Sequence, residues 1–147
     1  MRIPEQTRLR LLGFLATAAC AGLCLLYSRF RADMGEWWRG YGGGIPYVAF
    51  WACFGFMLMP RREWIGGICL AATLMTCGLE LMQLWNPEPL ASFRLTKFGA
   101  ALLGSTFMWS DFPPYFLGGL CGYAALRLVL ATADHLSKLS VLTRDGR

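Results

Sequence analysis

The chain has 147 residues, of which 56 % are hydrophobic and only 16 % are charged, and its mean hydropathy is +0.43. This composition is too apolar for a soluble domain, and the length is that of a single domain. The net charge of +5 also occurs in nucleic-acid-binding proteins, but no basic cluster here is interleaved with aromatic residues. We therefore expect one integral membrane domain over residues 1–147, oriented by its excess of Lys and Arg, and no nucleic-acid partner.

The cysteines lie inside apolar runs rather than in loops: Cys20, Cys24, Cys53, Cys69, Cys77 and Cys121. A disulfide framework needs cysteines in loops or at the surface, and a metal site needs convergent ligands. The one histidine, His135, follows the last apolar run. We therefore expect the cysteines to be buried small side chains, with no metal site and no cofactor.

The first apolar run covers residues 11–27 and follows a basic start with three arginines. The same pattern describes a signal peptide, and residues 16–18 resemble a cleavage site. This triplet, however, lies in the middle of the run, and the apolar character continues beyond it. We therefore expect an uncleaved first transmembrane helix over 11–27, preceded by a polar tail over 1–10.

A polar loop over residues 28–41 follows the first helix. It contains the pair Trp37 and Trp38, which fits the aromatic belt of a membrane interface. A binding surface lying over the helices is the alternative for this loop. Three glycines at positions 42–44 then loosen the start of the second predicted helix, which covers residues 43–59.

The third predicted helix, residues 64–85, is joined to the second by a tight polar turn, so the two should be antiparallel. Its length is about 33 Å at the helical rise, enough to cross a bilayer. Its polar residues recur at helical spacing and form one stripe: Thr73, Thr76, Cys77, Glu80 and Gln83. A carboxylate inside a membrane-length helix is costly, so this stripe should face other helices or a cavity rather than lipid.

The segment from residue 98 to residue 109 is apolar but too short to cross a bilayer. We expect it to be a re-entrant or interfacial segment, with packing against the bundle as the alternative. Asp111 then precedes two prolines, a strong start for a fourth helix over 112–133, and 134–147 is a polar tail. Gly118 and Gly122 have the small-xxx-small spacing that permits close helix packing, within the chain or in a homodimer.

If the chain crosses the membrane four times, nine Lys and Arg residues lie on the side of the termini and the second turn, and five lie on the other side. The positive-inside rule then places both termini in the cytoplasm, with the protein in the inner or plasma membrane. Polar residues of the loops and helix ends meet at the extracytoplasmic face and form our candidate site: Asp33, Glu80, Gln83, Arg94, Asp111 and Tyr115. Glu80 lies about 7 to 8 Å below the end of its helix, shallow enough for Arg94 to reach it.

Many residues of the third and fourth helices carry a resemblance to a known family. They are Thr76-Cys77-Gly78-Leu79-Glu80-Leu81-Met82-Gln83-Leu84-Trp85, Pro87, Leu90, Arg94, Gly99, Leu102-Leu103-Gly104, Phe107, Trp109-Ser110-Asp111-Phe112, Tyr115 and Gly118, with Gly43 to Tyr47 before them. From Arg29 to Tyr123 the chain resembles the bacterial membrane family named domain of unknown function 2809, which has no assigned reaction. It is also distantly similar to the VanZ-like group, with Tyr115 where VanZ-like proteins usually have asparagine. VanZ-like members are associated with glycopeptide tolerance, which implies envelope or lipid-linked ligands.

Three functions fit these residues. The first is binding of a lipid headgroup or envelope-related ligand, with Arg94 holding a phosphate or carboxylate and with Glu80 and Asp111 accepting from hydroxyl or amine groups. The second is an enzyme at the membrane face, in which Glu80 or Asp111 is the general acid or base; no recognised nucleophile accompanies them. The third is a structural or accessory subunit locked by these three residues, without a ligand. Expected partners are membrane lipids and either a second copy or another membrane protein.

Overall fold

The computed structural model describes residues 4–85, 87–103 and 107–145. In these ranges the chain is helical, and no strand occurs. The elements in chain order are α1 (Glu5–Phe30), η1 (Arg31–Asp33), α2 (Glu36–Tyr41), α3 (Gly44–Leu58), η2 (Arg62–Trp64), α4 (Ile65–Met82), α5 (Glu88–Arg94), α6 (Lys97–Leu103), η3 (Trp109–Asp111) and α7 (Phe112–Asp145).

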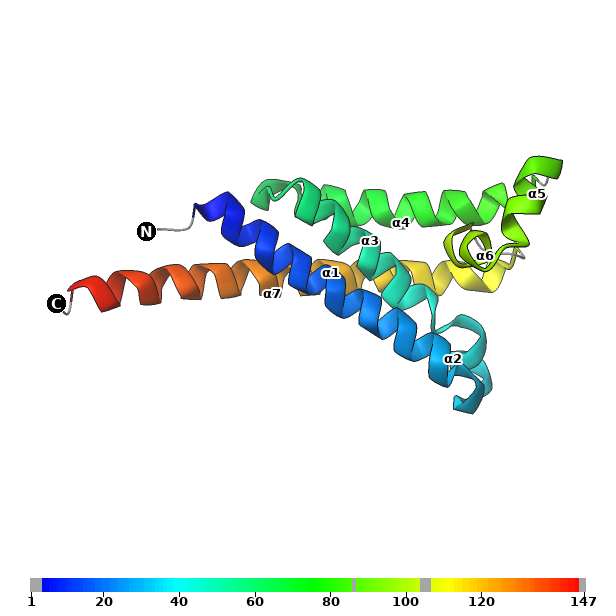
Figure 1. The fold of residues 1–147 in the computed structure, drawn as a ribbon, viewed down its shortest axis with the longest axis horizontal. Helices are drawn as coiled ribbons and strands as arrows, with labels where there is room; N and C mark the ends of the chain where they lie inside the picture. Colours follow the sequence, from blue (N-terminus) through cyan, green and yellow to red (C-terminus); the bar gives the residue numbers. More distant parts are fainter. Residues whose placement is uncertain (1–3, 86, 104–106, 146–147) are drawn as a thin grey trace.

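Within the described residues, four helical stretches are long and apolar enough to cross a membrane: Glu5–Asp33, Glu36–Leu58, Arg62–Met82 and Trp109–Lys138. This confirms the prediction of an all-α membrane protein with four spans. Figure 1 shows the elongated bundle of α1, α3, α4 and α7, with both chain ends at one end and with α2, α5 and α6 at the other. The end that carries the chain ends is called the terminal end below, and the other is called the loop end.

The central helix of the bundle is α3, which packs against α1, α4 and α7. Its side chains at Val48, Ala52, Cys53 and Phe56 are completely buried. Because α3 is apolar on all sides, it can be surrounded by other helices. The helices that flank it need only one apolar face toward the core and can turn the other to lipid.

Gly118 and Gly122 of α7 lie directly against α3. A Cβ atom at Gly118 would stand 2.7 Å from the Ile45 carbonyl oxygen, and one at Gly122 would stand 2.9 Å from the Cβ of Ala52. No larger residue fits without moving a helix, so these glycines set the spacing between α3 and α7. The face that the sequence left open for a homodimer is therefore filled by α3 of the same chain.

The glycines at the start of α3 are tightly packed. A Cβ atom at Gly43 would stand 2.6 Å from Cε1 of Tyr27, and one at Gly44 would stand 2.9 Å from the Tyr115 ring. The expectation that these glycines loosen the start of the helix was therefore wrong. They let the aromatic rings of α1 and α7 approach the first turn of α3.

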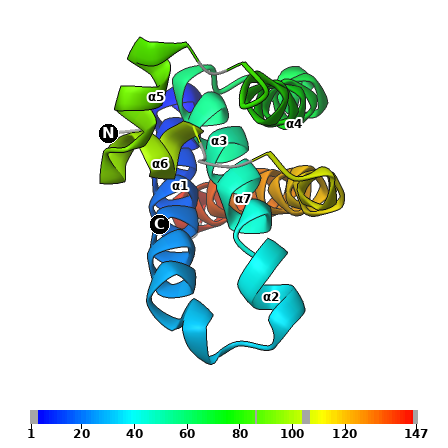
Figure 2. The same ribbon diagram turned by 90° about the vertical axis from the view of Figure 1, so that its right-hand side faces the viewer.

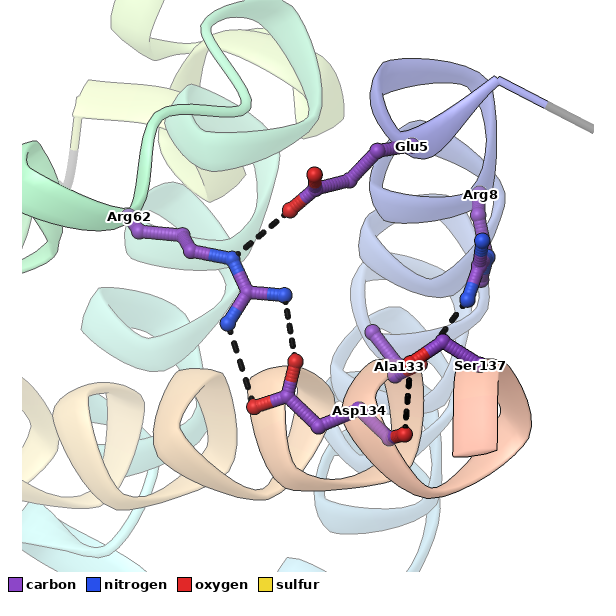
Figure 3. A network of polar contacts seen from close by, with 6 residues as sticks. All are labelled: Glu5, Arg8, Arg62, Ala133, Asp134 and Ser137. Atoms are coloured by element: carbon purple, nitrogen blue, oxygen red, sulfur yellow. Dashed lines mark hydrogen bonds and ion pairs between the residues drawn. The ribbon is translucent and has the colours of Figure 1, made fainter. Parts of the chain in front are cut away.

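At the terminal end, α1 and α7 extend beyond their apolar runs. α1 begins at Glu5 and α7 continues to Asp145, so most of the two predicted tails is helical. Figure 3 shows an ion-pair cluster at this end, in which the Arg62 guanidinium donates to Glu5 at 2.9 Å and to Asp134 at 2.6 and 3.1 Å. Polar residues therefore join the ends of the helices where the apolar contacts stop.

At the loop end, the predicted loop and the predicted short apolar segment are largely helical as well. Residues 28–41 contain the end of α1, η1 and α2. The predicted segment 98–109 contains most of α6 and the beginning of η3; its residues 104–106 lie outside the described ranges. Figure 1 shows α6 turned away from the long axis at the end of the bundle. The Tyr47 hydroxyl donates to the Leu102 carbonyl oxygen at 2.7 Å, which links α6 to α3.

The six cysteines are free thiols. Four of them, Cys20, Cys53, Cys69 and Cys77, are buried as expected, whereas Cys24 is half-buried and Cys121 is exposed on α7. A thiol behaves as a small apolar side chain. An exposed thiol in the middle of a membrane span therefore fits a helix face turned to lipid.

Candidate functional site

A cavity of about 300 Å³ lies at the loop end of the bundle. Residues of α1 to α4, α6 and α7 contribute to its wall. Figure 2 shows the ribbon from this end of the bundle, in which α2 and α6 lie apart. Its polar lining comprises Tyr27, Arg31, Tyr41, Tyr47, Thr76, Glu80, Gln83, Asp111 and Tyr115. The cavity therefore combines carboxylates, phenols and a guanidinium with the apolar side chains of Leu79, Leu102 and Leu103.

Glu80 is the most deeply buried charged residue of this wall, with 3 % of its surface exposed. Its Oε1 accepts from the Met108 backbone N–H at 2.9 Å. Its Oε2 accepts from Gln83 Nε2 at 2.9 Å and from the Tyr115 hydroxyl at 2.8 Å. Hydrogen bonds to a charged acceptor are about twice as strong as neutral ones. Glu80 thus ties α4 to the segment before η3 and to the first turns of α7.

Asp111 is the second carboxylate of the cavity, at the junction of η3 and α7. It is half-buried. Among the described residues, its carboxylate has no hydrogen-bond or ion-pair partner, in contrast to Glu80. It precedes α7 as the sequence predicted, but it makes no capping hydrogen bond to a described residue. Its oxygens are therefore available to a molecule in the cavity.

Arg94 is buried, with 8 % of its surface exposed, but it does not line the cavity. Its guanidinium donates to the carbonyl oxygens of Met82 at 3.1 Å and Trp85 at 3.4 Å. Carbonyls at a helix C-terminus lack intrahelical donors and carry partial negative charge, so they attract a cation. Pro87 begins the turn that brings α5 back over the end of α4. Arg94 therefore holds the end of α4, and the three donors to Glu80 do not include it.

The first loop contributes a different residue from the one expected. Asp33 is exposed and does not line the cavity, whereas Arg31 does. Tyr27, four positions earlier, also lines it, and α1 continues past this predicted end of the first helix to Phe30. Residues four apart share a helix face. Extending the helical pattern of residues 11–27 by one turn would have placed Arg31 beside Tyr27.

Two tyrosines fix the walls of the cavity. The Tyr27 hydroxyl is within hydrogen-bond distance of the carbonyl oxygens of Trp38 at 2.8 Å and Arg39 at 3.0 Å, which holds α2 against α1. Tyr47 holds α6 in the same way from α3. In the sequence, Tyr47 contributes only to the family resemblance; its position in the first turn of α3 is the signal that points to the loop end.

These groups define what the cavity can do chemically. An ammonium or hydroxyl group can donate to Asp111, and an anionic group can pair with Arg31. Of the six residues of the candidate site, Glu80, Gln83, Asp111 and Tyr115 line the cavity, and Asp33 and Arg94 do not.

One family model matches the sequence, and its description is "Protein of unknown function (DUF2809)". The match covers residues 34–119, which include α2 to α6 and the first turns of α7. No curated protein and no solved structure is similar enough to the chain to count as a match.

Proposed function

The chain belongs to the DUF2809 family, and we propose that it is a multi-pass membrane protein that binds the polar headgroup of a lipid or envelope-related ligand in the loop-end cavity. The observation that carries this proposal is the contrast between the two carboxylates. Glu80 accepts three hydrogen bonds from the protein, whereas Asp111 accepts none from the described residues. A half-buried carboxylate without a partner is partly desolvated, which is unfavourable, and a donor group of a ligand reduces that penalty.

The size and charge of the cavity narrow the class of ligand. A volume of about 300 Å³ accommodates a headgroup but not the acyl chains of a lipid. Asp111 favours an ammonium or hydroxyl group, and Arg31 favours a phosphate or carboxylate. A zwitterionic or hydroxyl-bearing phosphate headgroup satisfies both residues at once.

The orientation of the chain bears on the source of the ligand. The distribution of Lys and Arg favours cytoplasmic termini, and the two termini lie at the same end of the bundle (Figure 1). On that topology the cavity opens at the extracytoplasmic face of the cell membrane. The VanZ-like resemblance also favours an envelope ligand.

A structural role without a ligand is the second candidate, and the hydrogen bonds of Glu80 favour it. They join α4, the segment before η3 and α7, which is what a residue that only locks the loop end would do. The two candidates differ in the role of Asp111. A purely structural loop end does not require an unpartnered carboxylate in its cavity.

The test compares the wild type with Asp111→Asn and with the matched control Asp33→Asn, each purified in detergent. The thermal midpoint is measured with short-chain phosphatidylethanolamine, phosphatidylglycerol and phosphatidylcholine. We expect phosphatidylethanolamine to raise the midpoint of the wild type and of Asp33→Asn, and to have little effect on Asp111→Asn. If phosphatidylethanolamine does not stabilise the wild type, or if Asp111→Asn responds to it as the wild type does, the binding proposal fails and the structural role is favoured.

A further inference from the structure

A second cavity, of about 380 Å³, lies at the terminal end of the bundle. It opens between the first turns of α1 and the turn that joins α3 to η2. Its lining residues are Gln6, Arg10, Leu58, Met59, Pro60, Arg61 and Trp64. None of them belongs to the loop-end site, so this cavity is independent of the function proposed above.

The two arginines of this cavity differ from their neighbour Arg62. Arg62 is paired with both Glu5 and Asp134 (Figure 3). Within the described residues, the guanidinium groups of Arg10 and Arg61 have no hydrogen-bond or ion-pair partner. Because Arg62 already engages the two carboxylates of the ion-pair cluster, two positive charges remain uncompensated beside one cavity.

The remaining lining residues, apart from Gln6, are apolar. Leu58, Met59 and Trp64 expose 56 %, 54 % and 52 % of their surfaces, at the level where α3 ends and α4 begins. Tryptophan is favoured at the boundary between headgroups and hydrocarbon, and arginine extends its charged end toward headgroups from such a position. The cavity thus has a cationic wall and an apolar wall at the depth of a membrane interface.

We infer that this cavity binds an anionic phospholipid from the leaflet on the side of the chain termini. The lipid phosphate would pair with Arg10 and Arg61, since guanidinium groups hold phosphate oxygens through two parallel hydrogen bonds. The glycerol and the start of the acyl chains would lie against Leu58, Met59 and Trp64. A free phosphate ion would use only the cationic wall, so the apolar wall selects a lipid.

The experiment measures lipid affinity in detergent with the full-length chain, using short-chain phosphatidylglycerol as the probe. Short-chain phosphatidylcholine and inorganic phosphate are the comparison ligands. The variant is Arg10→Gln combined with Arg61→Gln, and the matched control is Arg39→Gln, an exposed arginine of α2 at the loop end. One basic side chain beside anionic lipid is worth about fivefold in affinity, so the double variant should bind phosphatidylglycerol about 25-fold more weakly.

The expected pattern is preferential binding of phosphatidylglycerol by the wild type, by Arg39→Gln and by Asp111→Asn. Equal affinity for phosphatidylglycerol and phosphatidylcholine would overturn the inference, as would binding of inorganic phosphate at equal strength. A loss in Arg39→Gln as large as that in the double variant would show a general effect of net charge and would equally overturn it. If the double variant does not fold, the single variant Arg61→Gln is measured instead. We expect its affinity for phosphatidylglycerol to fall about fivefold, and an unchanged affinity would overturn the inference.

Discussion

Replacement of Glu80 tests whether its hydrogen bonds hold the loop end together. Glu80→Ala leaves three donors, the Met108 N–H, Gln83 Nε2 and the Tyr115 hydroxyl, without the acceptor that they now share. A buried donor that loses its partner costs about 1 to 3 kcal/mol. The three together predict a loss of about 3 to 9 kcal/mol in the free energy of unfolding, with the lower part of this range expected if water enters from the cavity.

Glu80→Gln should be much milder, because the amide can keep most of these contacts. Its oxygen can accept from Met108, and its NH₂ group can donate to Gln83, whose buried Oε1 has no hydrogen-bond partner among the described residues. The Tyr115 hydroxyl can rotate to accept from the same NH₂ group. What remains lost is the charge of the acceptor, and this loss should be smaller than the loss of every partner in Glu80→Ala.

The assay is reversible unfolding in mixed detergent micelles, with Glu63→Ala as the control because Glu63 is exposed and lines neither cavity. We expect the order of stability to be wild type and Glu63→Ala, then Glu80→Gln, then Glu80→Ala. A Glu80→Ala protein as stable as Glu80→Gln would refute the reasoning, since only Glu80→Gln keeps a polar side chain that can bond to Met108, Gln83 and Tyr115.

Two further substitutions test the packing around the site. Gly118→Ala should lower stability by about 1 to 3 kcal/mol through overpacking, because its Cβ would stand 2.7 Å from the Ile45 carbonyl oxygen. The control Gly66→Ala should be neutral or slightly stabilising, because a Cβ there has nothing within 4 Å. Equal effects of the two substitutions in unfolding assays would contradict the close contact of α7 with α3. Arg94→Ala removes a guanidinium from the carbonyls at the end of α4 and should lower the free energy of unfolding by about 1 to 3 kcal/mol. Its affinity for the headgroup, measured as described for Asp111→Asn, should remain. A specific loss of affinity without a loss of stability would return Arg94 to the binding site.

Hydropathy predicts the four spans because membrane helices must be apolar over a fixed length. It does not predict where the helices end. α1 and α7 continue through polar residues that include Glu5 and Asp134, the partners of Arg62, and a pairing between three distant segments leaves no trace in local hydropathy. Because local hydropathy does not predict where helices end, residues 28–41 are predicted to be a loop although they are mostly helical.

The candidate site, too, could be predicted from the sequence only in part. Glu80 and Gln83 could be placed on a common face from helical spacing alone, and Asp111 and Tyr115 belong to the start of the next long helix. Arg94 could not be placed, because the direction of α5 depends on a turn beginning at Pro87 and not on any periodicity. The orientation rule brings loops to one face of the membrane, but it does not say which loop side chains enter a cavity.

The two carboxylates of the loop end therefore have different physical roles. Glu80 lies at the end of α4, and its three hydrogen bonds fix the segment before η3 and the start of α7. That arrangement determines where Asp111 stands, because Asp111 is the residue at which η3 passes into α7. A substitution at Glu80 should consequently impair ligand binding only in proportion to the loss of structure, whereas Asp111→Asn should impair binding in a folded protein. Measuring ligand affinity and stability in the same variants distinguishes the role of Glu80 from that of Asp111. Their residue types alone do not distinguish these roles.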